Sequence, residues 1–517
     1  MTAEVVVVGA GPIGLATAAL LHAAGIDVRI VDRGSEPSRY SKATTVHPRT
    51  LEVLQAVRAP GGSVADLMVA AGRKLPATHF GLLPQLLDYR GLDTEFPYVL
   101  MIPQAVTEGI LAGHLAAQGI AVRRGAELCR LEQDADRVRL HLRSAGREET
   151  VVSRFVVGAD GARSTVRREL GVGFPGTEPT LCGFVGDVEL RRPPGEPHFW
   201  DAARGTLNVL PLPGGRYRVF GVEAADTGLT PAQVRARRDV PVDRAGLRAS
   251  MTRIAGTDYG LGTVFWGSRN TDTTRHAERV RAGRVFLAGD AAHIHLPAGG
   301  QGLNVGVQDA ANLAWKLAAE VRGWAPAHLR SGTASYEAER LPVARRLAAN
   351  TLAQSAVAMT FSPANAELRR MLGEFIAHQG DTAAELTGWL SGLDVHYPAG
   401  PPPEGRRLPP LPLARGSLHD ALRVHRFLLV GFGGRDVGDA ALAGIDRTLV
   451  EPATTPGQWC GLAFGLVRPD GHLARGWPAE CSTADIAAGV AHWTTATTQC
   501  RSAPPGNRDG SPGVLEA

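Results

Sequence analysis

Hydrophobic and polar positions follow a clear order from the start of the chain. Residues 4–8 are four valines after a glutamate, which is the pattern of a fully buried strand. Residues 12–24 form an Ala/Leu-rich run of helical length, and residues 27–31 return to the strand pattern. These segments predict a strand–helix–strand unit of about 30 residues, with parallel strands and a right-handed connection.

Strand and helix patterns continue to alternate up to residue 390. Between residues 138 and 143, for example, three apolar side chains alternate with Arg and His, as in a strand with one buried face. In chain order, the pattern predicts a helix at residues 103–118, strands at 120–157, a strand-rich stretch at about 178–270, a strand at 284–288, a helix at 303–321 and helices at 326–390.

A proline-rich break follows, because seven of the sixteen residues 397–412 are prolines. Such a segment fits neither a sheet nor a helix interior, so we expect a linker at residues 396–413. Residues 414–495 are expected to form a small separate unit. The tail at 496–517 is rich in Ser, Pro, Gly and Thr, and we expect it to be disordered.

The turn between the first strand and the first helix carries the glycine pattern of a dinucleotide-binding loop. Gly9 allows a tight turn, Gly11 lets the backbone approach a pyrophosphate, and Gly14 lets helix and strand pack closely. Pro12 opens a helix whose N-terminus favours phosphate. Asp32 follows the second strand, where an acidic side chain binds ribose hydroxyls and disfavours a 2′-phosphate. The loop therefore predicts FAD or NAD and leaves the choice between them open.

Two further motifs favour FAD. At Asp160–Gly161 and again at Gly289–Asp290, an apolar strand ends in a turn whose carboxylate can accept hydrogen bonds from ribose or ribityl hydroxyls. Residues 297–304, Pro-Ala-Gly-Gly-Gln-Gly-Leu-Asn, then lead into a predicted helix. Their glycines would let the backbone approach a flat ring, and the helix N-terminus would stabilise the negative charge of a reduced flavin.

Composition narrows the class of protein. Of 517 residues, 44% are hydrophobic and 21% charged, and the formal net charge is +4, so we expect a globular protein of two to four domains without nucleic acid as its main partner. The five cysteines are scattered, which indicates neither a disulfide scaffold nor a metal site. Without a signal-peptide pattern or a long apolar stretch, we expect a cytoplasmic protein with no membrane span.

The three motifs, in this order and spacing, make residues 3–390 resemble the class A FAD-dependent aromatic hydroxylases of the p-hydroxybenzoate hydroxylase type. The runs at 289–304 and 307–317 look more narrowly like polyketide-tailoring hydroxylases and rifamycin-type monooxygenases, which carry a C-terminal thioredoxin-like domain without redox cysteines. The resemblance implies an α/β fold with a Rossmann-type FAD-binding domain at 1–175 and 271–395, a substrate-binding β-sheet domain at 176–270, and a small thioredoxin-like α/β domain at 414–495.

The resemblance also assigns roles to residues. It implies that FAD is held by the pyrophosphate loop (Gly9, Gly11, Pro12, Gly14), by Asp32 and Arg33 after the second strand, by Lys42 and Gln104, by Asp160 and Asp290, and by a loop along the isoalloxazine edge (Pro297, Gly300, Gly302, Leu303, Asn304). Lys42 stands where relatives usually have Arg. It keeps the positive charge but lacks the bidentate fork.

The implied chemistry is that NADH or NADPH reduces FAD, and that O2 then gives a C4a-(hydro)peroxyflavin that transfers one oxygen atom to an electron-rich ring. The leading hypothesis is hydroxylation of a polycyclic aromatic polyketide in antibiotic biosynthesis. Alternatives are oxidation of a rifamycin-type drug, Baeyer–Villiger oxygenation of a polycyclic ketone, and a flavoprotein that binds a ligand without turnover. The position oxidised, the preferred nicotinamide and the choice between monomer and homodimer stay open.

No residue stands out as the base that would activate a phenol. His47, near the cofactor motifs, and Arg218, on a strand of the predicted substrate sheet, are weak candidates against structural or surface roles. For His293 and His295, packing and hydrogen bonding are favoured over catalysis. Five aromatic residues could either face a flat ligand or pack in the core: Phe199, Trp200, Phe220, Phe265 and Trp266.

Overall fold

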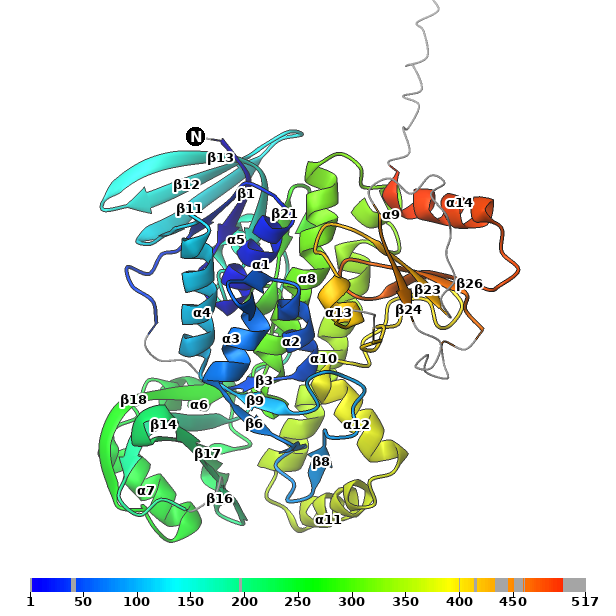
Figure 1. Cartoon of the computed structure of the whole chain (residues 1–517). Coiled ribbons are helices and arrows are strands. Elements are labelled where there is room, and N and C mark those ends of the chain that lie inside the picture. Colours follow the sequence, from blue (N-terminus) through cyan, green and yellow to red (C-terminus); the bar gives the residue numbers. More distant parts are fainter. Residues whose placement is uncertain are drawn as a thin grey trace, which may run out of the picture.

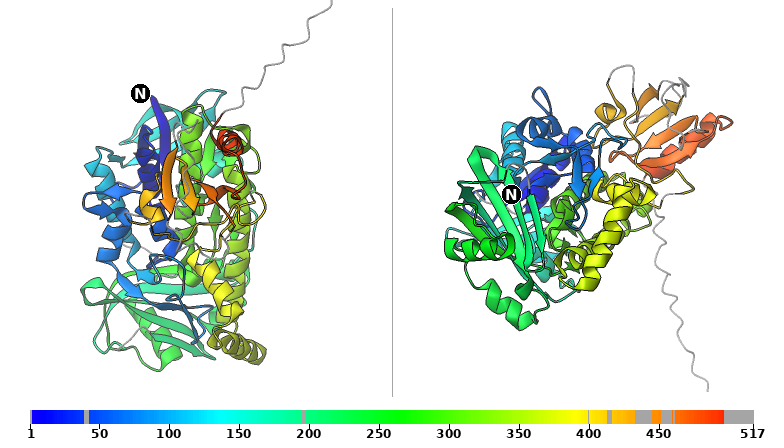
Figure 2. Two further views of the ribbon diagram at one scale, coloured as in Figure 1. Left: turned by 45° about the vertical axis from the view of Figure 1, so that its right-hand side comes forward. Right: turned by 90° about the horizontal axis from the view of Figure 1, so that it is seen from below.

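A computed structural model of the chain describes residues 2–38, 43–194, 198–398, 400–412, 416–432, 445–450, 459 and 461–495. The molecule has three parts: a large domain around the N-terminal strand, a second domain around an antiparallel sheet at 182–271, and a C-terminal unit (Figure 1). Figure 2 shows that the second domain and the C-terminal unit lie on different sides of the large domain. Among the described residues, no helix is both long and apolar enough to cross a membrane.

The large domain is built on an eight-stranded mixed sheet. Its central strands run parallel, whereas the last two form an antiparallel hairpin with their neighbour. The four valines of the first strand are buried because helices cover both faces of the parallel part. The order is β10 (Val122–Arg123), β2 (Val28–Val31), β1 (Thr2–Val8), β13 (Arg147–Gly158), β12 (Val138–Ser144) and β11 (Ala126–Gln133), with β21 (Val285–Leu287) beside β13 and β20 (Arg281–Ala282) beside β21.

Three helices predicted from the sequence pattern are confirmed to within two residues at each end: α1 (Pro12–Ala23), α4 (Gln104–Ala117) and α8 (Gln301–Val321). α8 packs against α1, and its N-terminus points to the same region as the glycine loop. Further elements of this domain are α2 (Pro48–Gln55), α3 (Val64–Ala71), α5 (Thr165–Glu169) and short strands β3 (Thr45–Val46), β4 (Arg58–Ala59), β5 (Gly62–Ser63), β6 (Arg73–Leu75), β7 (Ala77–His79), β8 (Leu86–Asp88), β9 (Val99–Met101), β19 (Arg275–His276) and β22 (His293–Ile294).

The second domain is a five-stranded antiparallel sheet in the order β15 (His198–Ala202), β16 (Gly205–Leu212), β17 (Arg216–Glu223), β14 (Cys182–Leu190) and β18 (Leu261–Thr271). The strand pattern missed two helices within it, α6 (Pro231–Arg238) and α7 (Arg244–Ala255). Their capping residues, Thr230 and Asp243, were the signal that could have found them. Alternate side chains of β14, β16 and β17 pack against α7, which leaves the other face of the sheet toward the large domain.

Helices extend the large domain after α8, as the pattern at 326–390 predicts. They are α9 (Ala327–Arg330), α10 (Tyr336–Met359), α11 (Pro363–Ala377) and α12 (Asp381–Ser391). α10 is long enough to pack beside α8 and to reach the second domain.

The C-terminal unit holds a four-stranded sheet in the order β24 (Asp446–Val450), β23 (Leu428–Phe432), β25 (Phe464–Val467) and β26 (Leu473–Trp477). β23 and β24 are parallel, and the other pairs are antiparallel, as in a thioredoxin-like sheet. The sheet is flanked by α13 (Leu418–Ala421) and α14 (Thr483–Thr494). The predicted tail at 496–517 lies outside the described residues.

The C-terminal unit that follows the predicted proline-rich linker packs against the large domain. Trp315 of α8 shares one hydrophobic cluster with Phe427, Leu466 and Trp493 of the C-terminal unit. The proline-rich segment has no long helix or strand, but Tyr397 and other side chains in it are buried. Proline excludes regular hydrogen bonding, and it does not exclude packing, so the segment joins the two cores instead of spacing them apart.

Candidate functional site

The glycine loop between β1 and α1 is closed on one side and open on the other. Gly9 has a φ of +106°, and a Cβ there would collide with the carbonyl oxygen of Ala159. A Cβ on Gly14 would collide with the carbonyl oxygen of Gly9. At Gly11, in contrast, a Cβ would meet no described atom within 4 Å. Because no side chain of the described residues caps α1, its first N–H groups are available to an anion.

The open side of the loop borders a cavity of about 220 Å³. The cavity lies where β1, β2 and β13 end side by side, so motifs far apart in the sequence meet in one space. Five residues predicted to bind the cofactor line it: Gly9, Gly11, Asp32, Arg33 and Asp160.

Asp32 ties the end of β2 to the glycine loop. Its carboxylate accepts hydrogen bonds from the backbone N–H groups of Ala10 and Gly34, both at 2.7 Å. Arg124 lies 4.0 Å from one carboxylate oxygen. Since each carboxylate oxygen can accept two hydrogen bonds, Asp32 keeps acceptor capacity for a ribose hydroxyl in the cavity.

One carboxylate oxygen of Asp160 accepts hydrogen bonds from the backbone, and the other has no partner among the described residues. Oδ2 accepts hydrogen bonds from the N–H groups of Thr165 and Val166, at 2.6 and 3.1 Å, and so caps α5. Oδ1 is buried and has no hydrogen-bond partner among the described residues. A buried acceptor is costly to leave unpaired. Together with the open space at Gly11, it shows that the residues present fit a dinucleotide with hydroxyl donors, such as FAD.

The turn at Gly289–Asp290 leaves Asp290 exposed and is fixed from behind by Asp309 of α8. One carboxylate oxygen of Asp309 accepts the N–H of Gly289 at 3.2 Å and pairs with Nε2 of His293 at 2.7 Å, while Nε of Arg340 donates to the other at 2.7 Å. Burial raises the pKa of Asp309, but Arg340 and His293 outweigh it and hold that pKa below its usual value. Asp309 has no role among the sequence-based predictions, although an Asp on an apolar helix face signals one.

The loop at 297–304 joins this turn to α8. Gly300 has a φ of +66°, and a Cβ there would collide with the side chain of Thr45. Asn304 is buried and holds the loop from inside, because its side chain accepts the N–H of His47 at 2.8 Å and donates to the carbonyls of Thr45 and Gly300 at 3.0 and 2.8 Å. Pro297 is exposed, and Gly302 is half-buried, as is Leu303.

His47 is part of this framework and is fully buried. Its Nε2 lies 2.8 Å from the carbonyl oxygen of Gly299, and its Nδ1 lies 3.3 Å from the hydroxyl of Tyr89. Burial lowers the pKa of His47 to about 4, with the bond to Gly299 acting in the opposite direction. A neutral ring then donates from Nε2 to that carbonyl and accepts from Tyr89, which places His47 in a structural role.

Gln104 begins α4 beside the same loop. Its N–H donates to the carbonyl of Ala43 at 3.0 Å, and its side chain donates to Glu108 at 2.7 Å. Lys42, the residue predicted next to the phosphates, lies outside the described residues.

Arg218 is neither a surface residue nor a free cation. It forms a two-point ion pair with Asp187 of the neighbouring strand, at 2.8 and 2.9 Å, and both side chains are buried. Its guanidinium also lies 5.8 Å from the ring centre of Trp266. The side chains of Phe199 and Trp200 lie outside the described residues, and those of Phe220 and Phe265 are half-buried.

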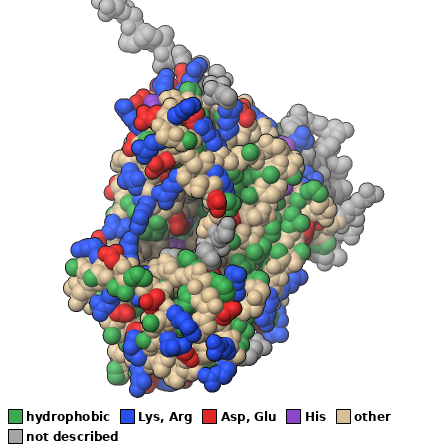
Figure 3. All heavy atoms as spheres, turned by 90° about the vertical axis from the view of Figure 1, so that its left-hand side faces the viewer, with side chains coloured by type: hydrophobic (Ala, Val, Ile, Leu, Met, Phe, Trp, Pro, Cys, Tyr) green, Lys and Arg blue, Asp and Glu red, His purple; other side chains and the backbone are tan. Residues whose placement is uncertain are grey.

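The face of the second-domain sheet opposite α7 meets the loop at 297–304. Val222 of β17 packs with Leu296, the residue before Pro297, and with Met359 at the end of α10. The molecular surface is hollowed between the two domains, with Lys and Arg side chains beside the hollow (Figure 3). At Leu296 the sheet therefore packs directly against the segment that leads into α8.

The fold and the cradle at the strand ends define a flavoprotein of the FAD-binding class. Consistently, the family model described as "FAD binding domain" matches residues 2–351. The chain therefore belongs to this family of FAD-dependent monooxygenases.

Relatives and solved structures agree with that membership. An aromatic compound monooxygenase of Bacillus subtilis is 38% identical, covering 96% of this chain and 99% of its own. A rifampicin monooxygenase of Rhodococcus hoagii is 36% identical, covering 91% and 94%. The structure of the anhydrotetracycline hydroxylase of Streptomyces rimosus matches with a TM-score of 0.83 at 38% identity, covering 96% and 99%.

Proposed function

We propose that this FAD-dependent monooxygenase takes reducing equivalents from NADPH or NADH and hydroxylates a polycyclic aromatic compound of the polyketide type. The observation that carries the proposal is the junction at Leu296, the residue before the 297–304 loop, which packs with Val222 of the second-domain sheet. The hollow between the two domains (Figure 3) would take a flat substrate beside the loop predicted to hold the isoalloxazine edge. The relatives named for anhydrotetracycline and rifampicin act on polycyclic compounds, which supports the same substrate class.

The FAD would be held by the cavity at the ends of β1, β2 and β13 and by the turns at Asp160–Gly161 and Gly289–Asp290. In this proposal Asp160 accepts a hydroxyl hydrogen bond through its unpartnered oxygen, and Asp32 takes the adenosine ribose. The remaining contacts come from the glycine loop, Arg33, Lys42, Gln104 and Asp290, and from Pro297, Gly300, Gly302 and Leu303 at the start of α8. Asn304 supports that loop from behind.

Bound FAD supplies the redox and oxygen-activating chemistry, and the chain's residues position and shield the reactants. The N-terminus of α8 stabilises negative charge at the flavin edge. The sheet face would orient a flat ring and exclude water, and the buried contacts of Leu296, Val222 and Met359 hold that sheet against the large domain. Neither predicted catalytic candidate is placed to act as a base, since His47 is buried in the framework and Arg218 is paired with Asp187.

The test is oxidation of NADPH by the FAD-loaded protein, followed at 340 nm with a panel of polycyclic phenols and quinones and with rifampicin. We expect one class of compound to stimulate the rate and to gain one oxygen atom. A rate that no compound changes, with no oxygenated product, would contradict the proposal.

Two alternatives give different products. If rifampicin alone is consumed, the function is drug oxidation, as in the relative named for it. If the product is a lactone or ester and not a phenol, the reaction is a Baeyer–Villiger oxygenation. Because both products gain the same mass, their structures must be solved.

A further inference from the structure

The turn at Gly289–Asp290 depends on a chain of buried contacts. Its first member is Asp309, which holds the N–H of Gly289 and the ring of His293. Its second member is Arg340 of α10, which is only 2% exposed and uses all three guanidinium nitrogens. Nε donates to Asp309 at 2.7 Å, and Nη2 donates to the carbonyl of Val305 in the second turn of α8 at 3.1 Å. Arg340 therefore restrains both loops assigned to the flavin.

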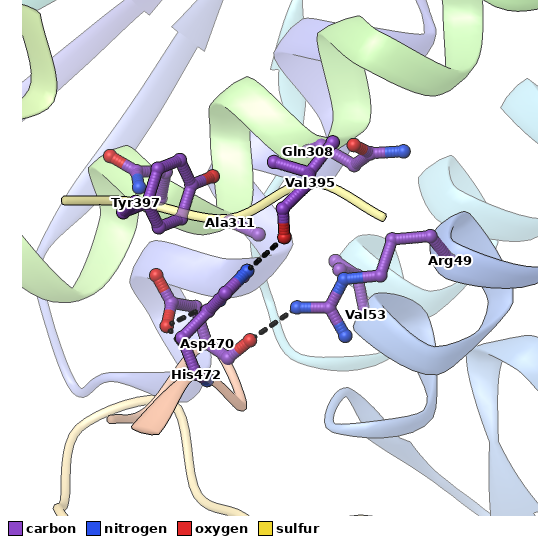
Figure 4. Close-up of a pocket in the computed structure, with 9 residues that line it drawn as sticks. Arg49, Val53, Gln308, Ala311, Val395, Tyr397, Asp470 and His472 are labelled. Atoms are coloured by element: carbon purple, nitrogen blue, oxygen red, sulfur yellow. Dashed lines mark hydrogen bonds and ion pairs between the residues drawn. The ribbon is translucent and has the colours of Figure 1, made fainter. Parts of the chain in front are cut away.

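The third guanidinium nitrogen connects this framework to the C-terminal unit. Nη1 of Arg340 donates to the hydroxyl of Tyr397 at 3.0 Å. The Tyr397 ring packs against the turn between β25 and β26, because its centre lies 4.5 Å from that of His472 and 4.9 Å from the guanidinium of Arg468. Tyr397 is thus one side chain whose ring packs on the C-terminal unit and whose hydroxyl contacts the large domain. Figure 4 shows it lining one small pocket together with Asp470 and His472.

The same turn is anchored to the large domain at independent points. Arg468 forms ion pairs with Glu339, the residue next to Arg340, and with Asp470. Asp470 accepts a hydrogen bond from the indole of Trp315 at 3.1 Å, and its carbonyl accepts one from Arg49. Since these groups are buried, the turn cannot shift without leaving charges unpaired. The Tyr397 ring is therefore held in a fixed place relative to Arg340.

We propose that Tyr397 and Arg340 are positioning residues that couple the C-terminal unit to the flavin turn, so that docking of this unit sets the affinity for FAD. The inference rests on the proposed placement of FAD against Asp290 and the 297–304 loop. It gives the C-terminal unit a part in cofactor binding that needs no redox-active cysteine. The order of contacts runs from Tyr397 through Arg340 and Asp309 to Gly289.

The first test is Tyr397→Phe, which removes only the hydroxyl that Arg340 contacts. The FAD dissociation constant is measured by quenching of flavin fluorescence with the full-length apoprotein, and the melting temperature of the apoprotein is measured beside it. We expect the dissociation constant to rise by about tenfold, as for the loss of one hydrogen bond to a charged group. The matched control is Ile254→Val in the α7 core, away from this chain of contacts. It should lower the melting temperature with less than a twofold change in FAD affinity.

A double-mutant cycle then separates coupling from general loss of stability. Arg340→Lys keeps the charge beside Asp309 but loses the contacts with Tyr397 and Val305. If the coupling runs through Arg340, adding Tyr397→Phe to Arg340→Lys weakens FAD binding no further. Additive losses, unchanged FAD affinity in Tyr397→Phe, or an equal loss in Ile254→Val would each overturn the inference. If the wild-type apoprotein fails to bind FAD, the proposed function fails instead.

Discussion

Glu339 of α10 and Arg468 of the C-terminal unit form a two-point ion pair, at 2.7 and 2.8 Å, although 129 residues separate them in the chain. Both side chains are buried. Lys316 donates to Glu339 at 2.6 Å, and Asp470 pairs with Arg468, so the group contains two positive and two negative side chains. Charges that balance in a buried cluster make the interface sensitive to the loss of any one member.

The Arg468→Ala variant should be strongly destabilised. Removing the guanidinium leaves Glu339 and Asp470 with too few partners in a buried site, and such losses cost about 3–5 kcal/mol. Urea unfolding monitored by tryptophan fluorescence measures the change. The control is Arg370→Ala on α11, because Arg370 is an exposed side chain that pairs with Glu367 and Glu374. Exposed pairs contribute little, so equal losses in the two variants would contradict the prediction.

Two substitutions in the glycine loop should affect different properties, one the affinity for FAD and the other the stability of the fold. In Gly11→Ala the added methyl group meets no atom of the described residues within 4 Å, so the apoprotein should keep its melting temperature while FAD binding weakens at least tenfold. In Gly14→Ala the methyl group collides with the carbonyl of Gly9, so the melting temperature itself should fall. Calorimetry of the apoproteins and FAD titration make the comparison. FAD affinity unchanged in Gly11→Ala would mean that the pyrophosphate does not lie there.

Asp160→Asn should lower FAD affinity with little effect on folding. An amide oxygen can replace Oδ2 as the cap of α5, but the amide NH2 then replaces the unpartnered acceptor Oδ1 with a donor. Losing one hydrogen bond between a hydroxyl and a charged acceptor costs about 1.5 kcal/mol, or roughly tenfold in the dissociation constant. The measurement is again FAD titration of the apoprotein. A melting temperature that falls as far as in Gly14→Ala would instead assign Asp160 to the cap alone.

The free energy of unfolding should decrease as the pH falls from about 6.5 to 5. The pKa of His47 is lowered from 6.5 to about 4 by burial, so the unfolded chain takes up a proton in this range and the folded protein does not. The pH slope of the unfolding free energy due to this residue is then about 1.4 kcal/mol per pH unit, with lower stability at lower pH. His47→Asn, which places a favoured residue at the N-cap position of α2, should reduce the slope by about that amount. Equal slopes in urea unfolding of both proteins would contradict this assignment.

Much of the cofactor cradle was predictable because its chemistry is local in sequence. The turn at Gly9, the helix start at Pro12 and the carboxylate at the end of β2 each follow from a strand pattern and its next few residues. Because parallel strands end at the same edge of a sheet, the turns that follow them lie close together irrespective of the structure of the rest of the chain. Hence the sequence predicted the FAD family, and the comparison with known proteins bears this out.

The candidate catalytic residues were harder to place because their roles depend on distant partners. Nothing near Arg218 in the sequence shows that Asp187 lies on the adjacent strand and pairs with it. His47 likewise became a framework residue because Gly299 and Asn304, some 250 residues away, surround it.

The sequence by itself determined the first strand–helix–strand unit, the helices α4 and α8, the three cofactor motifs and hence the class of enzyme, since each is encoded in a short stretch of residues. Only the tertiary structure decided how the C-terminal unit joins the large domain. The prolines of residues 397–412 indicated a linker, and only the tertiary structure shows that Tyr397 within it is buried between Arg340 and His472. Side-chain burial depends on which surfaces meet. A local pattern of prolines contains no information about the surface of the large domain against which these residues pack.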